Sequence, residues 1–258
     1  MLGRRKLALI GLALSQLRAT CSYAPPPVLM QGQGGDTLGP GRFNAGAEVG
    51  YGANGSWWNS QNVGDPDVNA AGIGAVRVRA GISENWDVGV VGGAGPDSTF
   101  VASPEVKWRF AQLHEDDPEG AAFHASLVSG LGFGVTTFRY GAYDVDPHSQ
   151  HAYIAPYTGV LVSGGISALQ MFSGLRFAAS ETLGTMRTDL TLYPVLAFGV
   201  EVRPDPVFHI FVETDVAGGL TASDFGNSGI LGSVTAGASV TFGRPLDKSK
   251  KAEPKKDP

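Results

Sequence analysis

The chain has 258 residues, of which 37 are glycine, 43% are hydrophobic and only 17% are charged. The apolar fraction excludes a wholly disordered chain, the single cysteine excludes an internal disulfide framework, and a net charge of -5 argues against a nucleic-acid partner. A glycine-rich all-β protein is the class that remains.

The first residues have the pattern of an export signal. Basic residues at 4–6 precede an apolar run at 7–17 that is too short to span a bilayer, so we predict a signal peptide over 1–20. Cys21 stands where a bacterial lipoprotein is cleaved and acylated, which makes it a candidate lipidation site. Cleavage nearby by the general signal peptidase is the alternative. Residues 21–41, which include three consecutive prolines, are interpreted as a periplasmic N-terminal linker.

From residue 42 onward, apolar residues alternate with polar residues or glycine. This period of two is typical of strands whose two faces meet different surroundings. Ten such segments are predicted, at 43–51, 76–82, 86–90, 105–110, 123–133, 153–162, 169–177, 190–203, 208–216 and 230–242. The number is even, as in single-chain bacterial outer-membrane barrels.

The connections between these segments also alternate in length. Those after odd-numbered segments are the longer ones, at 52–70, 94–103, 136–151, 180–188 and 218–229. Those after even-numbered segments are shorter, at 83–85, 164–167 and 204–206, with 112–120 as the exception. Short periplasmic turns and long outer loops are typical of a transmembrane β-barrel.

Aromatic residues gather at one predicted level of the barrel. If odd strands run outward, seven aromatic residues on apolar faces lie near the periplasmic interface: Phe43, Trp86, Trp108, Phe110, Phe123, Phe208 and Phe242. Such girdles are a property of membrane barrels. Pro156 and Pro194 fall inside predicted strands, where a closed barrel has no free edge, and they indicate bulges or misplaced boundaries.

These features, with a last strand that ends in Val240, Thr241 and Phe242, resemble the small outer-membrane β-barrel proteins of Gram-negative bacteria. The resemblance implies an all-β, antiparallel, up-and-down transmembrane β-barrel of about ten strands over 42–243, located in the bacterial outer membrane and surrounded by its lipid. It also implies that Phe242 is the assembly signal read by the barrel-assembly machinery. The chain departs from the pattern because it continues after that residue.

The charges on the polar faces are expected to line the lumen. Those singled out are Glu48, Arg77, Arg79, Lys107, Arg109, Arg176, Glu201 and Glu213. A ten-stranded barrel is narrow, so salt-bridged side chains that fill it are the simplest interpretation, and a narrow polar conduit is the alternative. Alternation alone does not tell which face is inside. A soluble periplasmic barrel with inverted faces therefore remains open.

The expected function is non-enzymatic, with a structural or small-pore role. The alternative is a subunit of a trans-envelope assembly for motility, secretion or surface-polymer export. In that case the tail at 244–258, with a net charge of +3 and three prolines, would bind a periplasmic protein or peptidoglycan.

Two small groups of residues could in principle carry chemistry. His124 and Ser126 loosely resemble part of the His-x-Ser-Asn run of lipid A deacylases, but Leu127 stands where the Asn would be. The loop at 144–151 holds two aspartates and two histidines, and we interpret it as a solvated polar loop. No cofactor and no metal site are expected.

Overall fold

In a computed structural model the chain forms ten β-strands. The structure describes residues 32–56, 67–95, 100–113, 121–137, 150–183, 190–221 and 229–243. The strands are β1 (Arg42–Ser56), β2 (Asp67–Gly81), β3 (Trp86–Ala94), β4 (Phe100–Leu113), β5 (Ala122–Thr137), β6 (Gln150–Ile166), β7 (Leu169–Leu183), β8 (Leu190–Val202), β9 (Phe208–Thr221) and β10 (Gly229–Gly243). Within these ranges, no helix has the length and apolar character needed to cross a membrane.

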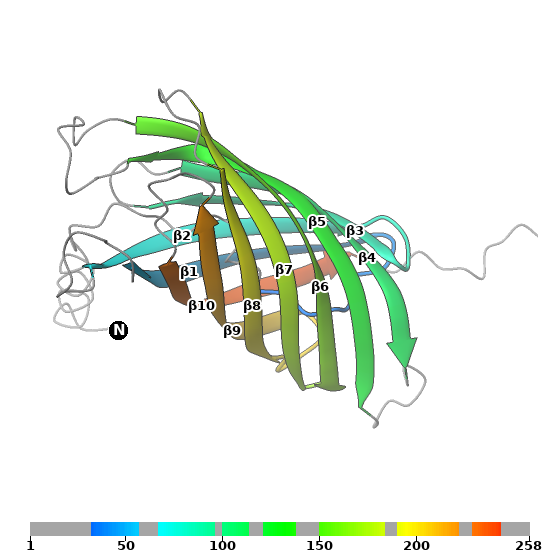
Figure 1. The fold of residues 1–258 in the computed structure, drawn as a ribbon. Helices are drawn as coiled ribbons and strands as arrows, with labels where there is room; N and C mark the ends of the chain where they lie inside the picture. Colours follow the sequence, from blue (N-terminus) through cyan, green and yellow to red (C-terminus); the bar gives the residue numbers. More distant parts are fainter. Residues whose placement is uncertain are drawn as a thin grey trace, which may run out of the picture.

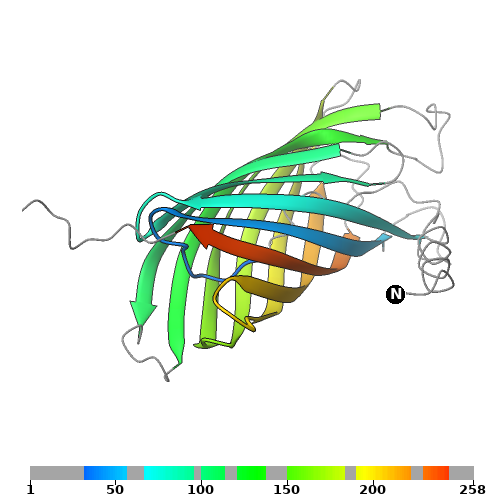
Figure 2. The same cartoon turned by 180° about the vertical axis from the view of Figure 1, so that it is seen from behind.

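The strands close into one barrel in which every strand is antiparallel to both of its neighbours (Figures 1 and 2). Closure is made by the pairing of β1 with β10, which runs from Arg42 opposite Gly243 to Ser56 opposite Gly229. Closure matters because a membrane-spanning sheet has no water with which to satisfy a free edge. The predicted ten-stranded up-and-down barrel is confirmed.

Most strands are longer than their alternating segments, mainly at the end that carries the long connections. The clearest case is β2, which begins at Asp67 and not at residue 76. Residues 67–75 pair with β1 in regular register although glycine and alanine predominate in them. Small residues give no alternation of hydrophobicity, so the sequence pattern stops short of the paired strand.

Pro156 and Pro194, two of the three prolines that lie inside the described strands, produce no bulge, which corrects the expectation. Pairing with the following strand lapses at Pro156 and again at Pro194, but the register is unchanged on either side of each gap. Each proline therefore removes only the backbone hydrogen bonds between strands at its own position. The register shift lies elsewhere, between β4 and β5 at Arg109 and Ala111.

The outside of the wall is apolar. Large hydrophobic side chains exposed on it come from all ten strands, and include Val76, Val90, Leu175, Val212 and Val234. Most of their neighbours along each strand point inward and are buried or half-buried. Such a continuous apolar exterior belongs in hydrocarbon, so the inverted, water-soluble arrangement is wrong and the barrel is of the outer-membrane type.

The predicted aromatic girdle is present at the end with the short turns, which we call the periplasmic end. All seven aromatic residues are exposed on the outside of the wall there. Phe43 stacks on Phe242 across the β1–β10 seam with ring centroids 5.8 Å apart, and Trp86 stacks on Trp108 at the same separation. Aromatic rings at this level mark the membrane interface and fix the depth of the barrel.

Candidate functional site

The charges inside the barrel include two ion-pair clusters. In the first cluster, Arg77 on β2 contacts Glu48 on β1, with Nη2 3.3 Å from Oε1, and approaches Glu105 on β4 at 4.0 Å. Asp87 on β3 lies 3.8 Å from the ammonium of Lys107 on β4. Buried charges are tolerated when they are paired and hydrogen-bonded, so these contacts account for so many charges in a narrow lumen.

The second cluster joins strands that are not neighbours. Arg176 on β7 is fully buried and donates from Nη2 to Asp215 on β9 at 2.7 Å, with Glu213 at 3.5 Å. Asp215 also accepts a hydrogen bond of 3.1 Å from Ser233 on β10. The cluster thus connects three strands across the inside of the wall, with one guanidinium facing two carboxylates.

Residues 32–38, which we call the inner segment, lie inside the barrel at its periplasmic end. The chain before β1 turns back from the rim toward the interior (Figure 2). The inner segment is held by hydrogen bonds to β2, β3, β4, β5, β6 and β9: with Arg79, Asp87, Glu105, Lys107, Ser126, Ser163 and Glu213. Because its partners surround the lumen, the inner segment crosses the mouth of the barrel.

Individual contacts show how closely the inner segment is fitted. Gln33 is 2% exposed, donates to Glu105 at 3.0 Å and accepts from Arg79 at 2.7 Å. The backbone N–H of Gly32 donates to Glu213 at 2.8 Å, which links the inner segment to the second cluster. Charge-assisted hydrogen bonds of this kind are roughly twice as strong as neutral ones.

Glycine is required at two positions of the inner segment. Gly32 has φ of +44°, and a Cβ there would lie 2.3 Å from the ring of Phe211. A Cβ on Gly35 would lie 2.6 Å from the carbonyl oxygen of His124 and 3.0 Å from that of Leu161. Both oxygens belong to the barrel backbone and cannot move easily, so only glycine allows the chain to pass here.

At the periplasmic mouth, Asp36 of the inner segment forms an ion pair with Arg203, which follows β8. Asp36 Oδ2 lies 2.8 Å from Arg203 Nη2. Burial opposes ionisation of the carboxyl, but the charges of Arg203, Lys107 and Arg79 outweigh it and hold the pKa of Asp36 well below its ordinary value. Burial likewise disfavours the Arg203 cation, but Asp36 and Glu201 raise the pKa of this guanidinium further.

The direction of the Asp36 pKa shift determines the pH range over which this ion pair stabilises the folded state. A carboxyl whose pKa is depressed in the folded state stabilises that state above its unfolded pKa and loses the effect only as pH falls through the folded value. The contact of Asp36 with Arg203 therefore persists at a pH of about 4, where an ordinary aspartate is already about half protonated.

An apolar layer lies beyond the charged layer. It is formed by Ile73, Ala75, Val91, Val101, Val128, Tyr153, Ala155, Tyr157, Leu161, Ala178, Tyr193, Val195 and Ala217. Tyr157 joins the two layers, because its hydroxyl donates to Glu105 at 3.0 Å and accepts from Ser103 at 3.2 Å. The lumen is thus filled in two successive layers of different chemistry.

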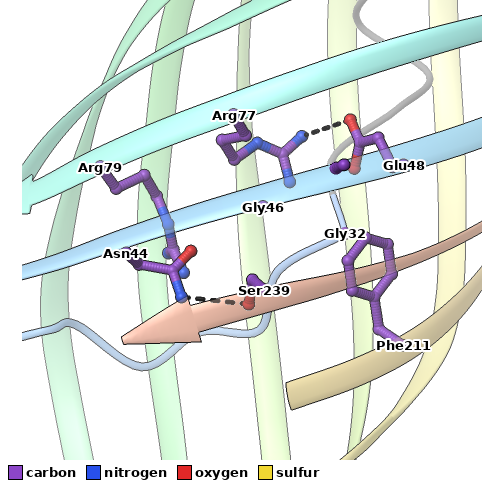
Figure 3. A pocket seen from close by; sticks show the side chains of 9 residues that line it. Gly32, Asn44, Gly46, Glu48, Arg77, Arg79, Phe211 and Ser239 are labelled. Carbon is purple, nitrogen blue, oxygen red and sulfur yellow. Dashed lines mark hydrogen bonds and ion pairs between the residues drawn. The ribbon is translucent and has the colours of Figure 1, made fainter. Parts of the chain in front are cut away.

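A small cavity remains beside the first cluster. It is lined by Gly32, Arg77, Arg79, Phe211, Ser239 and neighbouring residues, and its volume of about 10 Å³ is at the lower limit for one water molecule (Figure 3). In this view Arg77 points to Glu48, and Asn44 points to Ser239 across the β1–β10 seam. This cavity has no room for an organic substrate.

The structure places the residues singled out in the sequence as follows. Buried in the lumen are Glu48, Arg77, Lys107, Arg176, Glu201 and Glu213, with Arg79 slightly more exposed. Arg109 lies at the periplasmic rim, where its guanidinium donates to the backbone oxygen of Glu84 and to Asn85. Phe242 is on the outside of the last strand. Cys21 lies outside the described residues.

The remaining candidates are His124, Ser126 and the polar loop at 144–151. Ser126 donates its hydroxyl hydrogen to the carbonyl oxygen of Gly35, and His124 is buried beside it. The described ranges contain no group of three or more side chains placed to hold a metal ion. Residues 144–149 of the polar loop and the tail at 244–258 lie outside those ranges.

Sequence reasoning missed the inner segment. It treated residues 21–41 as a linker, whereas residues 32–38 occupy the lumen. The available signal was the run Gly32-Gln33-Gly34-Gly35-Asp36, which has small residues and two polar side chains but no bulky one. Such a run is compatible with a segment packed inside the barrel, but equally with a flexible linker.

Comparisons with known proteins give only distant structural likenesses. No family model and no curated protein matches the chain. Among solved structures, the chain is similar to the outer membrane protease OmpT of Escherichia coli (11% identity, 80% of this chain and 99% of that chain, TM-score 0.43). It is also similar to the COG4313 outer membrane channel of Pseudomonas putida F1 (7% identity, 83% and 100%, TM-score 0.46) and to Ail of Yersinia pestis (16% identity, 79% and 99%, TM-score 0.27).

These likenesses are too distant to transfer an activity. The location in the bacterial outer membrane rests on the chain's own geometry. The chain forms a closed, even-stranded antiparallel barrel with an apolar exterior, an aromatic girdle and a lumen that is polar at the periplasmic end.

Proposed function

We propose that the protein is a closed outer-membrane barrel with a structural role, and that it does not work as a permanently open pore. The observation that carries this proposal is the double closure of the lumen. The inner segment crosses the periplasmic mouth, and the apolar layer fills the barrel beyond it. Conduction needs a continuous hydrated path, which an apolar constriction interrupts.

The two closures differ in kind, and this favours a structural role over a simple gate. The inner segment is held mainly by hydrogen bonds and ion pairs. If the segment leaves the lumen, water can take its place as the hydrogen-bond partner of the wall. The apolar layer contains Val128 and Val195, which are fully buried, and opening it would expose hydrocarbon side chains to water. Removal of the inner segment alone therefore leaves the barrel closed. The role as a subunit of a trans-envelope assembly depends on residues 244–258 and remains a prediction.

Conductance in planar lipid bilayers tests this proposal. We expect no stable conductance steps from the folded wild-type barrel, and none from a variant that lacks residues 32–38, because the apolar layer persists in both. An open porin in the same membranes serves as the positive control, and a mobility difference between unboiled and boiled samples shows that each variant is folded. Reproducible steps of one amplitude from the wild type would contradict a closed barrel.

A further inference from the structure

Basic side chains lie around Asp36 at the periplasmic mouth, and we call this group the Asp36 seat. Its basic side chains are Arg79 from β2, Lys107 from β4 and Arg203 after β8, which contact Gln33, Gly34 and Asp36 of the inner segment from different parts of the barrel wall. Arg203 contacts the carboxylate directly at 2.8 Å. Lys107 and Arg79 hold the neighbouring part of the inner segment, at Gly34 and Gln33.

The basic groups of the seat are also held from behind by the wall. Arg203 donates two hydrogen bonds to Glu201, at 3.1 and 2.9 Å. Lys107 and Arg79 each approach Asp87, at 3.8 and 4.0 Å. These contacts do not involve Asp36, so the cations keep their positions if the carboxylate leaves. The seat is thus preorganised, which lowers the cost of binding a new ligand.

The seat is partly open to water at its Arg203 side, unlike the second ion-pair cluster, whereas Lys107 is buried behind it. The side chain of Asp36 is 27% exposed and that of Arg203 is 16% exposed, whereas Arg176 in the second cluster is fully buried. A solute in the periplasm can therefore reach Arg203 without unfolding the barrel.

We propose that the Asp36 seat is a carboxylate-binding site, and that Asp36 occupies it as an internal competitor of an external ligand. A guanidinium presents paired N–H donors that match a carboxylate, and the nearby ammonium adds a second positive charge. The ligand is a molecule with a free carboxylate that reaches the barrel from the periplasmic side. It is either a small organic acid or the carboxyl end of a peptide.

This competition predicts that the wild type binds an external carboxylate more weakly than a variant without Asp36. A tethered group competes with an effective concentration in the millimolar range or above, so an external carboxylate binds weakly to the wild type. Replacing Asp36 by alanine removes the competitor and leaves the three cations in place. We expect the affinity for an external carboxylate to rise by about tenfold or more, since the competing ion pair is partly buried.

Isothermal titration calorimetry on the full-length barrel, folded in detergent and held at constant ionic strength, tests the proposal. Succinate serves as the small-acid probe. The dipeptide Ala-Ala serves as the peptide probe, and its C-terminal amide, which lacks the carboxylate, serves as the control. We expect Asp36→Ala to bind succinate more tightly than the wild type. Tight binding of Ala-Ala, but not of its amide, would identify a peptide carboxyl end as a ligand; binding of succinate alone would identify a small acid.

Control variants separate the seat from general charge effects. Asp205→Asn removes one negative charge from the same periplasmic end, where Asp205 accepts hydrogen bonds only from the backbone of its own turn, and it should bind like the wild type. Adding Arg203→Gln to Asp36→Ala should abolish the gain. Asp36→Asn, which keeps the shape of the side chain, is the second test variant if Asp36→Ala does not fold.

The proposal is overturned if neither Asp36 variant binds carboxylates better than the wild type, or if the gain survives Arg203→Gln. This outcome is independent of the proposed closed barrel, which fails only if the wild type conducts.

Discussion

Replacing Arg176 by methionine is expected to lower the free energy of unfolding by about 3–5 kcal/mol. Arg176 is fully buried and pairs with Asp215 at 2.7 Å and with Glu213 at 3.5 Å. Its removal leaves two carboxylates facing each other in a place that water does not reach. The measurement is urea unfolding of the barrel in lipid vesicles, followed by tryptophan fluorescence and by the mobility of unboiled samples.

Two controls show whether the loss comes from uncompensated charge. Arg109→Met removes an arginine at the exposed rim, and it should cost less than about 1 kcal/mol. The triple variant Arg176→Met, Glu213→Gln, Asp215→Asn removes the whole set of charges and should recover most of the stability, because a buried ion pair contributes little net stability. Equal losses for Arg176→Met and Arg109→Met would contradict the ion-pair arrangement.

Replacing Gly35 by valine is expected to expel the inner segment from the lumen. The added Cβ would lie 2.6 Å from the carbonyl oxygen of His124, a backbone atom of β5, and overpacking of this kind costs about 1–3 kcal/mol. The readout is the rate at which a cysteine at position 33 reacts with a water-soluble maleimide, in a chain whose own Cys21 is replaced by serine. Gln33 is 2% exposed, so the rate should rise by about tenfold to a hundredfold when the segment leaves.

Gly74→Val is the matched control for this experiment. Gly74 lies on β2, and no atom comes within 4 Å of a Cβ added there, so valine fits without displacing its surroundings. The labelling rate at position 33 should then stay at the wild-type value. Fast labelling without the Gly35 substitution would show that residues 32–38 do not rest in the lumen.

The barrel itself could be predicted from sequence because lipid and lumen impose opposite chemistry on alternate residues. The ten alternating segments, the sorted connections and the aromatic residues from Phe43 to Phe242 all follow from that one constraint. The constraint weakens where both faces carry small residues. This is why the first residues of β2, from Asp67 onward, gave no signal.

The contents of the lumen could be predicted only in part. Alternation places Arg176, Glu213 and Asp215 on the inner face, but it does not tell which acid meets which base, because the contacts cross from β7 to β9. The inner segment has no periodic pattern, and Gly32 meets a partner 181 residues away in the sequence. Such contacts depend on the closed shape of the barrel, which local sequence does not encode.

An engineered disulfide between residues 34 and 163 tests most directly whether the inner segment lies in the lumen. A Cβ on Gly34 would be 2.9 Å from Cβ of Ser163, so a small shift brings two cysteines to the separation of about 3.8 Å that a disulfide needs. With Cys21 replaced by serine, we predict that Gly34→Cys and Ser163→Cys crosslink in the folded barrel and change its mobility on a denaturing, non-reducing gel. Gly34→Cys should not crosslink with Ser129→Cys, because Ser129 pairs with Thr158 on the exposed side of the wall. Absence of the first crosslink, or equal formation of the second, would contradict an inner segment seated in the lumen.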